Sequence, residues 1–229
     1  MSKVVLITGG SSGIGKSIGE FLHQKGFVVY GTSRNPEKIT NSIFSLVALD
    51  VRDKQSIVNC VAEVIQKSGR LDIVINNAGV GITGPIEEIP TEEIRNNLPY
   101  RGIYSASKGA LELITEALRM EVKSFGIQIT NVAPGDFATN IAAGRYHAPV
   151  VKGSAYEVPY GNTLKEMDSH VDSGSNPNEM AEAIFAIIKT DKPKVHYKVG
   201  AFMQKFSIVL KRILPDTIYE KMLMNHYKL

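Results

Sequence analysis

The sequence predicts an α/β fold in which a doubly wound parallel sheet is covered by helices on both faces, in three layers. Short apolar runs of strand length alternate along the chain with segments whose apolar residues recur at helical spacing. The first run, residues 4–7, is apolar at every position, as expected for a strand buried on both faces. With 229 residues, of which 43% are hydrophobic, the chain is long enough to bury one such core.

Six strands are expected in chain order, at residues 4–7, 27–30, 46–49, 73–75, 127–132 and 195–199. Apolar residues at helical spacing follow the first strand and then the third: Ile14, Ile18, Phe21 and Leu22, and then Ile57, Val61, Val64 and Ile65. A later helix is expected to begin with Asn176 as its cap and Pro177 at its first position. No repeat or linker divides the chain, so we expect one domain over residues 1–229.

Composition excludes several classes of protein. Cys60 is the sole cysteine, so no intrachain disulfide can form, and nothing at the beginning resembles a signal segment; we therefore expect a cytoplasmic protein. The chain contains no run of about 18 apolar residues, so we expect no membrane-spanning helix. The net charge of +3 is too small for a nucleic-acid-binding face. His147 and His170 have no partners at ligand spacing, so no metal site is expected.

A glycine-rich loop, TGGSSGIG at residues 8–15, lies between the first strand and the first helix. A phosphate-bearing ligand needs a tight turn without Cβ atoms in its way and a helix N-terminus whose free N–H groups face the anion. A plain glycine turn is the alternative, but a position after a buried strand and before an amphipathic helix favours a dinucleotide site. The residues expected to bind the cofactor here are Gly9, Ser11, Ser12, Gly13, Ile14 and Gly15.

Further motifs follow in order: Asp50-Val51 after strand three, NNAG at 76–79 after strand four, YSASK at 104–108, and PGDFAT at 134–139. With the G-x-x-x-G-x-G spacing of the loop, they resemble the short-chain dehydrogenase/reductase family over residues 3–200. The resemblance implies a Rossmann-like fold and NAD(P)-dependent oxidation or reduction of an alcohol or carbonyl. It also implies cofactor contacts from Asp50, Val51, Asn77, Ala78, Gly79, Tyr104, Lys108, Pro134, Gly135 and Thr139.

The end of the second strand predicts which cofactor is used. A carboxylate there would bond the ribose 2′-hydroxyl of NAD, whereas a cation accommodates the 2′-phosphate of NADP. Ser33 and Arg34 occupy this turn, and no acidic residue occurs before Glu37. NADP is therefore favoured over NAD; the alternative is an exposed arginine with no ligand.

Tyr104 and Lys108 lie one helical turn apart, so both are expected on one face of a helix. By resemblance to the family, Tyr104 exchanges a proton with the substrate oxygen, and Lys108 holds the nicotinamide ribose and lowers the pKa of the phenol. Bringing a phenol from a pKa of about 10 to near 7 requires about 4 kcal/mol of preferential stabilisation. The alternative is that Tyr104 packs in a core and Lys108 is solvated.

The interval before Tyr104 is too short for the fold. Only 24 residues separate Gly79 from Tyr104, whereas a helix, a central strand and their connections need about 30. In the family this interval carries a catalytic Asn and the Ser that hydrogen-bonds the substrate. Thr91 lies where that Ser is expected, but its context predicts a helix cap. Loss of such a donor commonly costs about 100-fold in rate.

Two explanations of the junction Asn97-Leu98 remain open. The natural polypeptide contains further residues there, or the deletion is genuine and the chain is a catalytically inert nucleotide-binding protein. We favour the first, since the motifs on both sides are intact; an intact mass of 25.0 kDa would refute it.

The substrate and partners are expected from the last third of the chain. Residues 140–175 are expected to form the substrate loop, and residues 201–229 a helical tail that is mixed apolar and basic. The tail is expected to pack on the domain or on a second subunit of a homo-oligomer; the alternatives are that it caps an apolar pocket or contacts a membrane surface. We expect an NADP-dependent oxidoreductase acting on a bulky apolar carbonyl or alcohol, such as a steroid, a retinoid or another lipid-like molecule.

Overall fold

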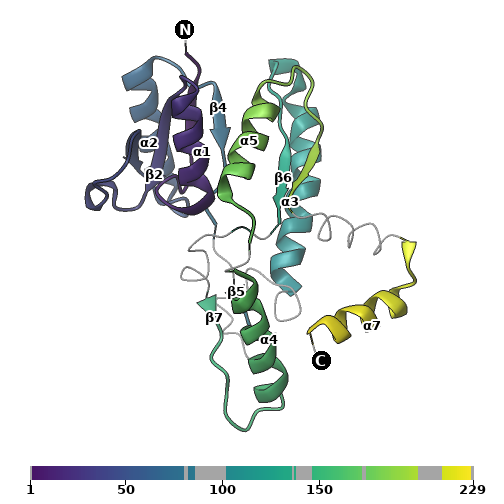
Figure 1. Cartoon of the computed structure of the whole chain (residues 1–229). Coiled ribbons are helices and arrows are strands. Elements are labelled where there is room, and N and C mark those ends of the chain that lie inside the picture. Colours follow the sequence, from purple (N-terminus) through teal and green to yellow (C-terminus); the bar gives the residue numbers. More distant parts are fainter. Residues whose placement is uncertain are drawn as a thin grey trace. The chain divides into compact units, whose positions relative to one another are not determined.

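The fold is seen in a computed structural model, which describes residues 2–79, 82–85, 102–135, 137, 146–171, 174–200 and 213–227 (Figure 1). Thr91, Thr139 and the first part of the tail, residues 201–212, lie outside the described residues. The chain divides into two units, one of residues 1–79 and 176–190 and one of residues 80–175 and 191–229. Each unit is described by itself.

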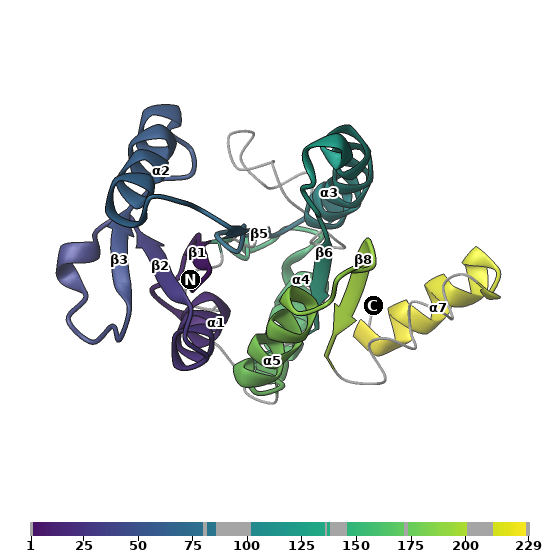
Figure 2. The same ribbon diagram turned by 90° about the horizontal axis from the view of Figure 1, so that it is seen from above.

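The first unit contains a parallel sheet in the order β3-β2-β1-β4, which confirms the predicted parallel sheet. Its elements are β1 (Val4–Ile7), α1 (Gly13–Gln24), β2 (Val28–Ser33), the 3-10 helix η1 (Pro36–Lys38), β3 (Ser45–Ala48), α2 (Lys54–Ser68), β4 (Ile73–Ile75) and α5 (Pro177–Ile188). Within this unit, α2 covers one face of the sheet, and α1 and α5 lie together at the other (Figure 2).

Local sequence accounts for these elements. The four residues of β1 are β-branched or leucine and are all buried, as the continuous apolar run predicts. The side chain of Asp53 caps α2 by accepting from the N–H groups of Gln55 and Ser56, and Gly69 ends that helix in the left-handed conformation. Asn176 caps α5 as predicted, with its side chain accepting from Asn178 N at 3.0 Å.

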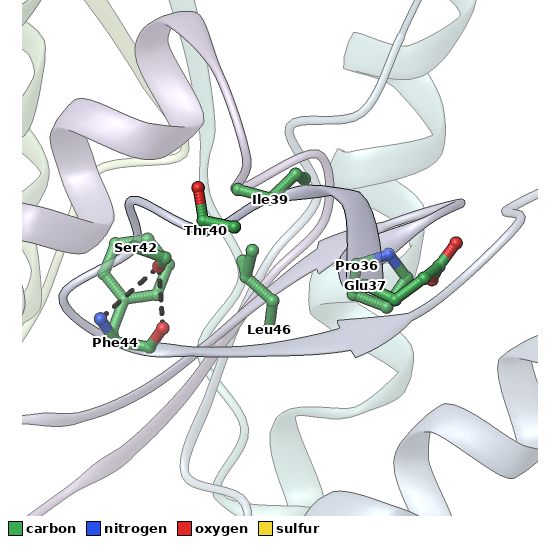
Figure 3. Close-up of a pocket in the computed structure, with 7 residues that line it drawn as sticks. All are labelled: Pro36, Glu37, Ile39, Thr40, Ser42, Phe44 and Leu46. Carbon is green, nitrogen blue, oxygen red and sulfur yellow. Dashed lines mark hydrogen bonds between the residues drawn. The ribbon is translucent and has the colours of Figure 1, made fainter.

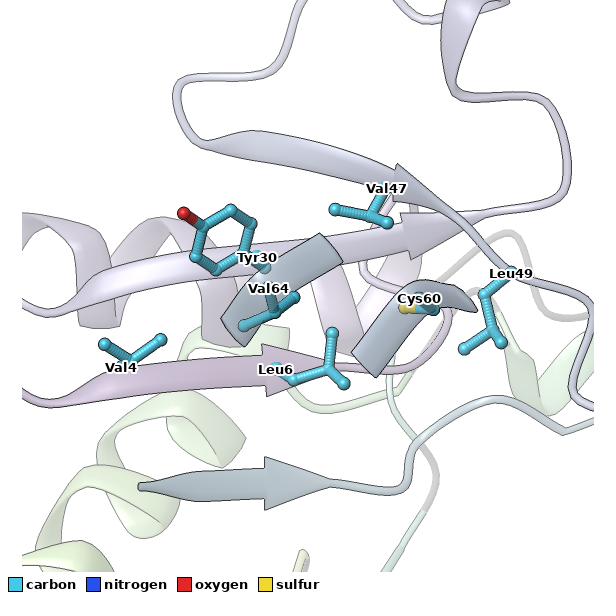
Figure 4. Packing of buried hydrophobic residues seen from close by; sticks show 7 residues of the cluster. All are labelled: Val4, Leu6, Tyr30, Val47, Leu49, Cys60 and Val64. Carbon is cyan, nitrogen blue, oxygen red and sulfur yellow. The ribbon is translucent and has the colours of Figure 1, made fainter. Parts of the chain in front are cut away.

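The core of the first unit lies on both sides of the sheet. Under α2, seven buried residues pack together (Figure 4): Val4, Leu6, Tyr30, Val47, Leu49, Cys60 and Val64. On the other side, the ring of Phe185 in α5 makes edge contacts with Phe21 at 5.8 Å and Phe27 at 6.2 Å. Residues 176–190, far along the chain, therefore belong to the same core as β1.

The second unit contains two short parallel ladders, β5 with β7 and β6 with β8. Its elements are β5 (Ile82–Thr83), α3 (Gly102–Glu121), the 3-10 helix η4 (Lys123–Phe125), β6 (Asn131–Pro134), β7 (Tyr146–His147), α4 (Glu157–Val171), β8 (His196–Val199) and α7 (Asp216–Tyr227). Arg119 fastens α3 to this unit by donating to the carbonyl oxygens of Ile129 and Pro193. Glu116 of α3 also contacts His196 at 2.8 Å.

The predicted strand over residues 127–132 is wrong over its first four residues, since β6 begins only at Asn131. The side chain of Gln128 donates to Asp191 O, and the hydroxyl of Thr130 donates to Lys194 O at 2.7 Å. Side chains thus join this segment to residues 191–195 where a backbone ladder was expected. The predicted substrate loop also differs from a plain loop, because it contains β7 and α4.

Candidate functional site

The predicted cofactor-binding residues of the first unit follow the carboxyl ends of its strands. The glycine loop follows β1, Ser33 ends β2, Asp50 comes two residues after β3, and Asn77 comes two residues after β4. Because the four strands are parallel, these ends meet at one edge of the sheet. Ligands of open parallel sheets bind outside this edge.

The glycine loop adopts a conformation that requires glycine at particular positions. Gly9 has a φ of 65° and Gly13 a φ of 53°, in the region that other residues rarely adopt. A Cβ atom at Gly15 would lie 2.5 Å from both Asn77 Nδ2 and the carbonyl oxygen of Gly9. The loop is therefore packed too closely against the end of β4 to carry a side chain at residue 15.

The start of α1 suits an anionic ligand. Ser12 is extended at the cap position, and its side chain makes no capping hydrogen bond. The first N–H groups of a helix have no partner within the helix, and they carry the positive end of its dipole. The N–H groups at Gly13, Ile14 and Gly15 can therefore bind phosphate oxygens, which fits the diphosphate of a dinucleotide.

The side chains of Asn77 and of two threonines support the glycine loop through hydrogen bonds. The side chain of Asn77 donates to the carbonyl oxygens of Thr8 and Gly9, at 2.9 and 3.3 Å. The hydroxyl of Thr8 accepts from the N–H groups of Asn77 and Ala78, and the hydroxyl of Thr32 accepts from Gly9 N at 3.1 Å. In this structure Asn77 holds the loop, whereas the sequence suggested only a contact with the cofactor.

Replacing Gly15 with Ala is expected to weaken NADPH binding about tenfold or more. The new methyl group must displace Asn77 or the backbone of Gly9, and small displacements of this kind are costly when ligand groups have to be positioned. Fluorescence titration with NADPH measures the change. The matched control is Gly161→Ala in α4, where the nearest atom to the added Cβ is 4.0 Å away. Equal affinities in the two variants would contradict the packing argument.

Charged residues gather at the ends of β2 and β3. The Arg52 guanidinium donates to both carboxylate oxygens of Asp50, at 3.0 and 2.7 Å. This bond, with a smaller effect of the nearby Arg34 charge, holds the pKa of Asp50 well below its usual range. Arg34 is exposed, and the hydroxyl of Ser33 accepts from Asn35 N at 3.2 Å. Val51, beside Asp50, is also exposed.

The predicted catalytic pair lies in the second unit. Tyr104 and Lys108 are both within α3, four positions apart, so the backbone places them on the same side of the helix. Lys108 is exposed to solvent. Pro134 ends β6, and Gly135 N donates to Val199 O at 2.6 Å. The predicted site residues thus fall into two groups, one in each unit.

The side chain of Tyr160 connects parts of the segment predicted to bind the substrate, residues 140–175. It is 0% exposed, and its hydroxyl lies 3.0 Å from Thr83 O and 2.8 Å from Ala148 O. Both carbonyl oxygens belong to the β5–β7 region, so this one hydroxyl fastens α4 to that ladder. Removing this buried hydroxyl is costly: Thr83 O keeps the N–H of Ala148 as a donor at 2.8 Å, but Ala148 O loses the hydroxyl that donates to it.

We expect Tyr160→Phe to lower the free energy of unfolding by about 1–3 kcal/mol, the usual cost of leaving buried polar groups unsatisfied. Urea denaturation followed by circular dichroism measures this change. Tyr219→Phe in α7, at a position that is only half-buried, is the control and should change stability little. Equal stability of Tyr160→Phe and the parent would show that the hydroxyl does not hold α4 in place.

A surface hollow of about 390 Å³ lies beside β3 in the first unit (Figure 3). Its lining residues are Pro36, Glu37, Ile39, Thr40, Ser42, Phe44 and Leu46. None of them was predicted as a site residue. The hollow is formed mainly by the connection between β2 and β3, and none of the predicted cofactor-binding or catalytic residues lines it.

The described residues contain neither a metal-binding cluster nor a membrane-spanning helix. Among them, no group of three His, Cys, Asp or Glu side chains could hold a metal ion. None of the described helices is both long enough and apolar enough to cross a membrane.

The sequence did not predict four residues whose side chains support the candidate site or the segment beside it: Thr8, Thr32, Arg52 and Tyr160. Thr8 and Thr32 lie in strand-end positions beside predicted site residues, and that position was the available signal. Arg52 was not recognisable as the partner of Asp50, and no sequence pattern marked Tyr160 as buried.

Comparison with known proteins identifies the family. The model of the short chain dehydrogenase family matches residues 3–100 and 95–149. A 3-ketodihydrosphingosine reductase of Bacteroides thetaiotaomicron is 31% identical over 264 aligned positions, covering 98% of each chain. An NADPH-dependent 3-dehydrocapnine reductase of Ornithobacterium rhinotracheale is 27% identical over 282 positions, covering 99% of this chain and 98% of that one.

A solved structure agrees with these matches. The crystal structure of a short-chain dehydrogenase from Streptomyces avermitilis superimposes with a TM-score of 0.75 and 26% sequence identity, covering 96% of this chain and 97% of the other. The match includes most of both chains and therefore the helices and strands of both units. The chain belongs to the short-chain dehydrogenase/reductase family of oxidoreductases.

Proposed function

We propose that this protein is an NADP-dependent oxidoreductase that interconverts a ketone and an alcohol on a bulky, lipid-like substrate. The single observation that carries the proposal is the Tyr104–Lys108 pair within one turn of α3, in a chain of this family. A phenol near a lysine is suited to exchange a proton with a substrate oxygen.

NADP is the proposed cofactor. The turn after β2 presents Ser33 and Arg34 and no carboxylate, which favours a 2′-phosphate over a free 2′-hydroxyl. The 3-dehydrocapnine reductase is named as NADPH-dependent, and one similar solved fold, an alcohol dehydrogenase from Thermococcus sibiricus, contains a modified NADP. When bound, the cofactor supplies or accepts the hydride.

The chain's own residues then have separate roles. The N–H groups at the start of α1 bind the diphosphate. The side chain of Asn77 holds the glycine loop in the conformation in which these N–H groups face the phosphates. Arg34 pairs with the 2′-phosphate, with Ser33 beside it. Tyr104 donates a proton to the ketone oxygen during reduction and accepts it back in the reverse direction, while Lys108 holds the nicotinamide ribose and favours the phenolate.

The proposed substrate class is a long-chain ketone. Two relatives that align over almost the whole of this chain are named as reductases of compounds with an oxidised position 3, a 3-ketodihydrosphingosine and a 3-dehydrocapnine. Ketodihydrosphingosine is a lipid. The large apolar side chains exposed on α7, among them Ile218, Met222 and Met224, suit a partner of that character.

We further propose a homo-oligomer in the cytoplasm, with contact to a membrane surface through residues 201–229 as the alternative use of the tail. Sedimentation velocity distinguishes an oligomer from a monomer. Flotation with anionic vesicles tests the membrane contact, because a basic and apolar segment binds such surfaces.

A catalytically inert nucleotide-binding protein is the second candidate. It is favoured by one observation, the short interval between Gly79 and Tyr104, in which the family carries its substrate-binding Ser. NADPH binding without turnover would then be the whole activity.

One sample decides between the two candidates. NADPH affinity is measured by fluorescence, and NADPH oxidation is then followed with 3-ketodihydrosphingosine and with small polar ketones. Oxidation with the long-chain ketone alone supports the proposal, and oxidation with only the small ketones refutes the substrate class. Binding with no oxidation supports the inert protein. Failure to bind NADPH or NADH refutes both.

A further inference from the structure

The ends of β2 and β3 place a carboxylate next to the arginine proposed to bind the 2′-phosphate. In the parallel register of the two strands, Ser33 is the partner of Ala48, and the N–H of Leu49 donates to Ser33 O at 2.9 Å. Arg34 and Asp50 are the next residues of the two segments. The two charged residues therefore leave neighbouring strands at the same edge of the sheet.

A carboxylate without a partner at this position would oppose the binding of NADP in two ways. It would repel the 2′-phosphate, because charges of the same sign repel each other at short range. It would also compete with the phosphate for Arg34, since a guanidinium binds carboxylates and phosphates through the same pair of donors. Arg34 is exposed, and within the part of the chain that the structure describes it makes no ion pair.

Arg52 engages the carboxylate of Asp50 instead. Its guanidinium donates from Nε to Oδ1 at 3.0 Å and from Nη2 to Oδ2 at 2.7 Å, and its backbone N–H donates to Oδ1 at 3.0 Å. The N–H of Asp50 in turn donates to the hydroxyl of Ser56, in the first turn of α2, at 3.0 Å. The hydrogen bonds from Arg52, and to a smaller extent the charge of Arg34, hold the pKa of Asp50 below its usual range.

The first unit contains a second arginine–aspartate pair with the same spacing in the sequence. The Nε of Arg70 lies 3.0 Å from both carboxylate oxygens of Asp72, and its Nη2 donates to one of them. Asp72 also accepts from Val4 N at 2.8 Å. Val4 begins β1 and Asp72 directly precedes β4, so this pair lies at the amino ends of the strands, whereas Asp50 and Arg52 follow a carboxyl end. The two pairs share their chemistry and differ in the edge of the sheet at which they lie.

We propose that Arg52 determines cofactor specificity by neutralising the carboxylate of Asp50, which leaves Arg34 available to the 2′-phosphate of NADPH. The inference rests on the proposed function, in which Arg34 binds that phosphate. Arg52 acts through its neighbours and is a positioning residue. NADH carries no charge at the ribose 2′ position, so its binding does not depend on Arg52. The ratio of the Kd for NADH to the Kd for NADPH therefore measures the effect.

The first test is the variant Arg52→Ala, titrated with NADPH and with NADH by fluorescence. We expect the Kd for NADPH to rise about three- to tenfold and the Kd for NADH to change less than about twofold. The loss is smaller than that expected for Arg34→Ala, because Arg52 acts indirectly and exposed charges are partly screened. Thermal unfolding followed by circular dichroism checks that the variant is folded.

Arg70→Ala is the matched control. It removes the same charge and the same kind of ion pair, but at the amino ends of the strands. Both Kd values are expected to stay within about twofold of the parent. If Arg70→Ala lowered the ratio as much as Arg52→Ala, a general charge effect would explain both variants, and the role of Arg52 would be overturned.

A double variant separates neutralisation of Asp50 from a direct contact between Arg52 and the phosphate. Asp50→Asn combined with Arg52→Ala removes the carboxylate charge together with its partner, and we expect the ratio to return to within about twofold of the parent. Any effect of Asp50 on the part common to both nucleotides cancels in the ratio. If the double variant kept the reduced ratio of Arg52→Ala, Arg52 would act on the phosphate itself and the proposal would be overturned.

The conservative variant Arg52→Lys keeps the charge and loses the paired donors, so its ratio should lie between those of the parent and Arg52→Ala. A ratio equal to that of Arg52→Ala would contradict the proposal.

Failure of this inference and failure of the proposed function give different results. If Arg34→Ala leaves the ratio unchanged, the proposed 2′-phosphate site is wrong. If Arg34→Ala lowers the ratio and Arg52→Ala does not, only the role of Arg52 is overturned.

Discussion

Replacing Tyr104 with Phe is expected to lower kcat for NADPH-dependent ketone reduction by about 10²-fold or more. The substitution removes one hydroxyl and keeps the ring, so the proton donor is lost with little change in volume. NADPH affinity should stay within about twofold, since we propose that α1 of the first unit binds the diphosphate, whereas Tyr104 lies in α3 of the second. Steady-state kinetics with the best ketone of the panel, together with NADPH titration, measures both quantities.

The chain offers a close control for this variant. Tyr100 lies four residues earlier and has a tyrosine, not a lysine, four positions after it. Tyr100→Phe is therefore expected to keep kcat within about threefold of the parent, well short of the loss expected for a general acid. If Tyr104→Phe kept the parent's kcat, or if both variants lost it equally, the assignment of the proton donor would be wrong.

Replacing Arg34 with Ala is expected to raise the Kd for NADPH by roughly 10- to 100-fold while changing the Kd for NADH little. Hydrogen bonds to charged groups contribute about 1.5–3 kcal/mol, and each 1.4 kcal/mol corresponds to a tenfold change in affinity. Arg34 is exposed at the end of β2, so its removal should not disturb the core. Only the 2′-phosphate distinguishes the two cofactors, and the ratio of the two Kd values isolates it.

Lys38→Ala is the matched control for Arg34. Lys38 is another exposed cation, at the end of η1, and it lies four residues farther along the same connection. Its removal changes the net charge equally and should weaken NADPH binding no more than about twofold at physiological salt, since exposed charges are screened. Equal losses in the two variants would indicate a general charge effect, and equal losses of NADPH and NADH affinity in Arg34→Ala would refute the 2′-phosphate role.

The sequence predicted the elements whose signals are local. The apolar run of β1, the Asn176 cap of α5 and the glycine loop were all found from neighbouring residues, because burial pattern, capping and turn geometry are encoded within a few positions. The strand over residues 127–132 was placed less well. Its beginning depends on side chains that bind residues 191–195, more than 60 positions away.

The electrostatics of the site could be predicted only in part. The arginine at the end of β2 was visible in the sequence, but the pairing of Asp50 with Arg52 depends on the turn that follows β3. That turn holds the pKa of Asp50 below its usual range and engages both of its carboxylate oxygens with Arg52, which the sequence did not indicate. The same holds for Asn77, whose amide supports the glycine loop through contacts 68 and 69 residues away in the chain.

The sequence alone predicted the family, the parallel character of the sheet, a preference for a 2′-phosphate and the Tyr104–Lys108 pair. Each of these depends on short motifs or on the order in which such motifs follow one another along the chain. Tertiary structure alone decided that the hydroxyl of Tyr160 connects α4 to the β5–β7 ladder and that the hydroxyls of Thr8 and Thr32 support the glycine loop. These features depend on which distant segments meet, and burial and pairing are properties of the folded chain that no short stretch of sequence contains.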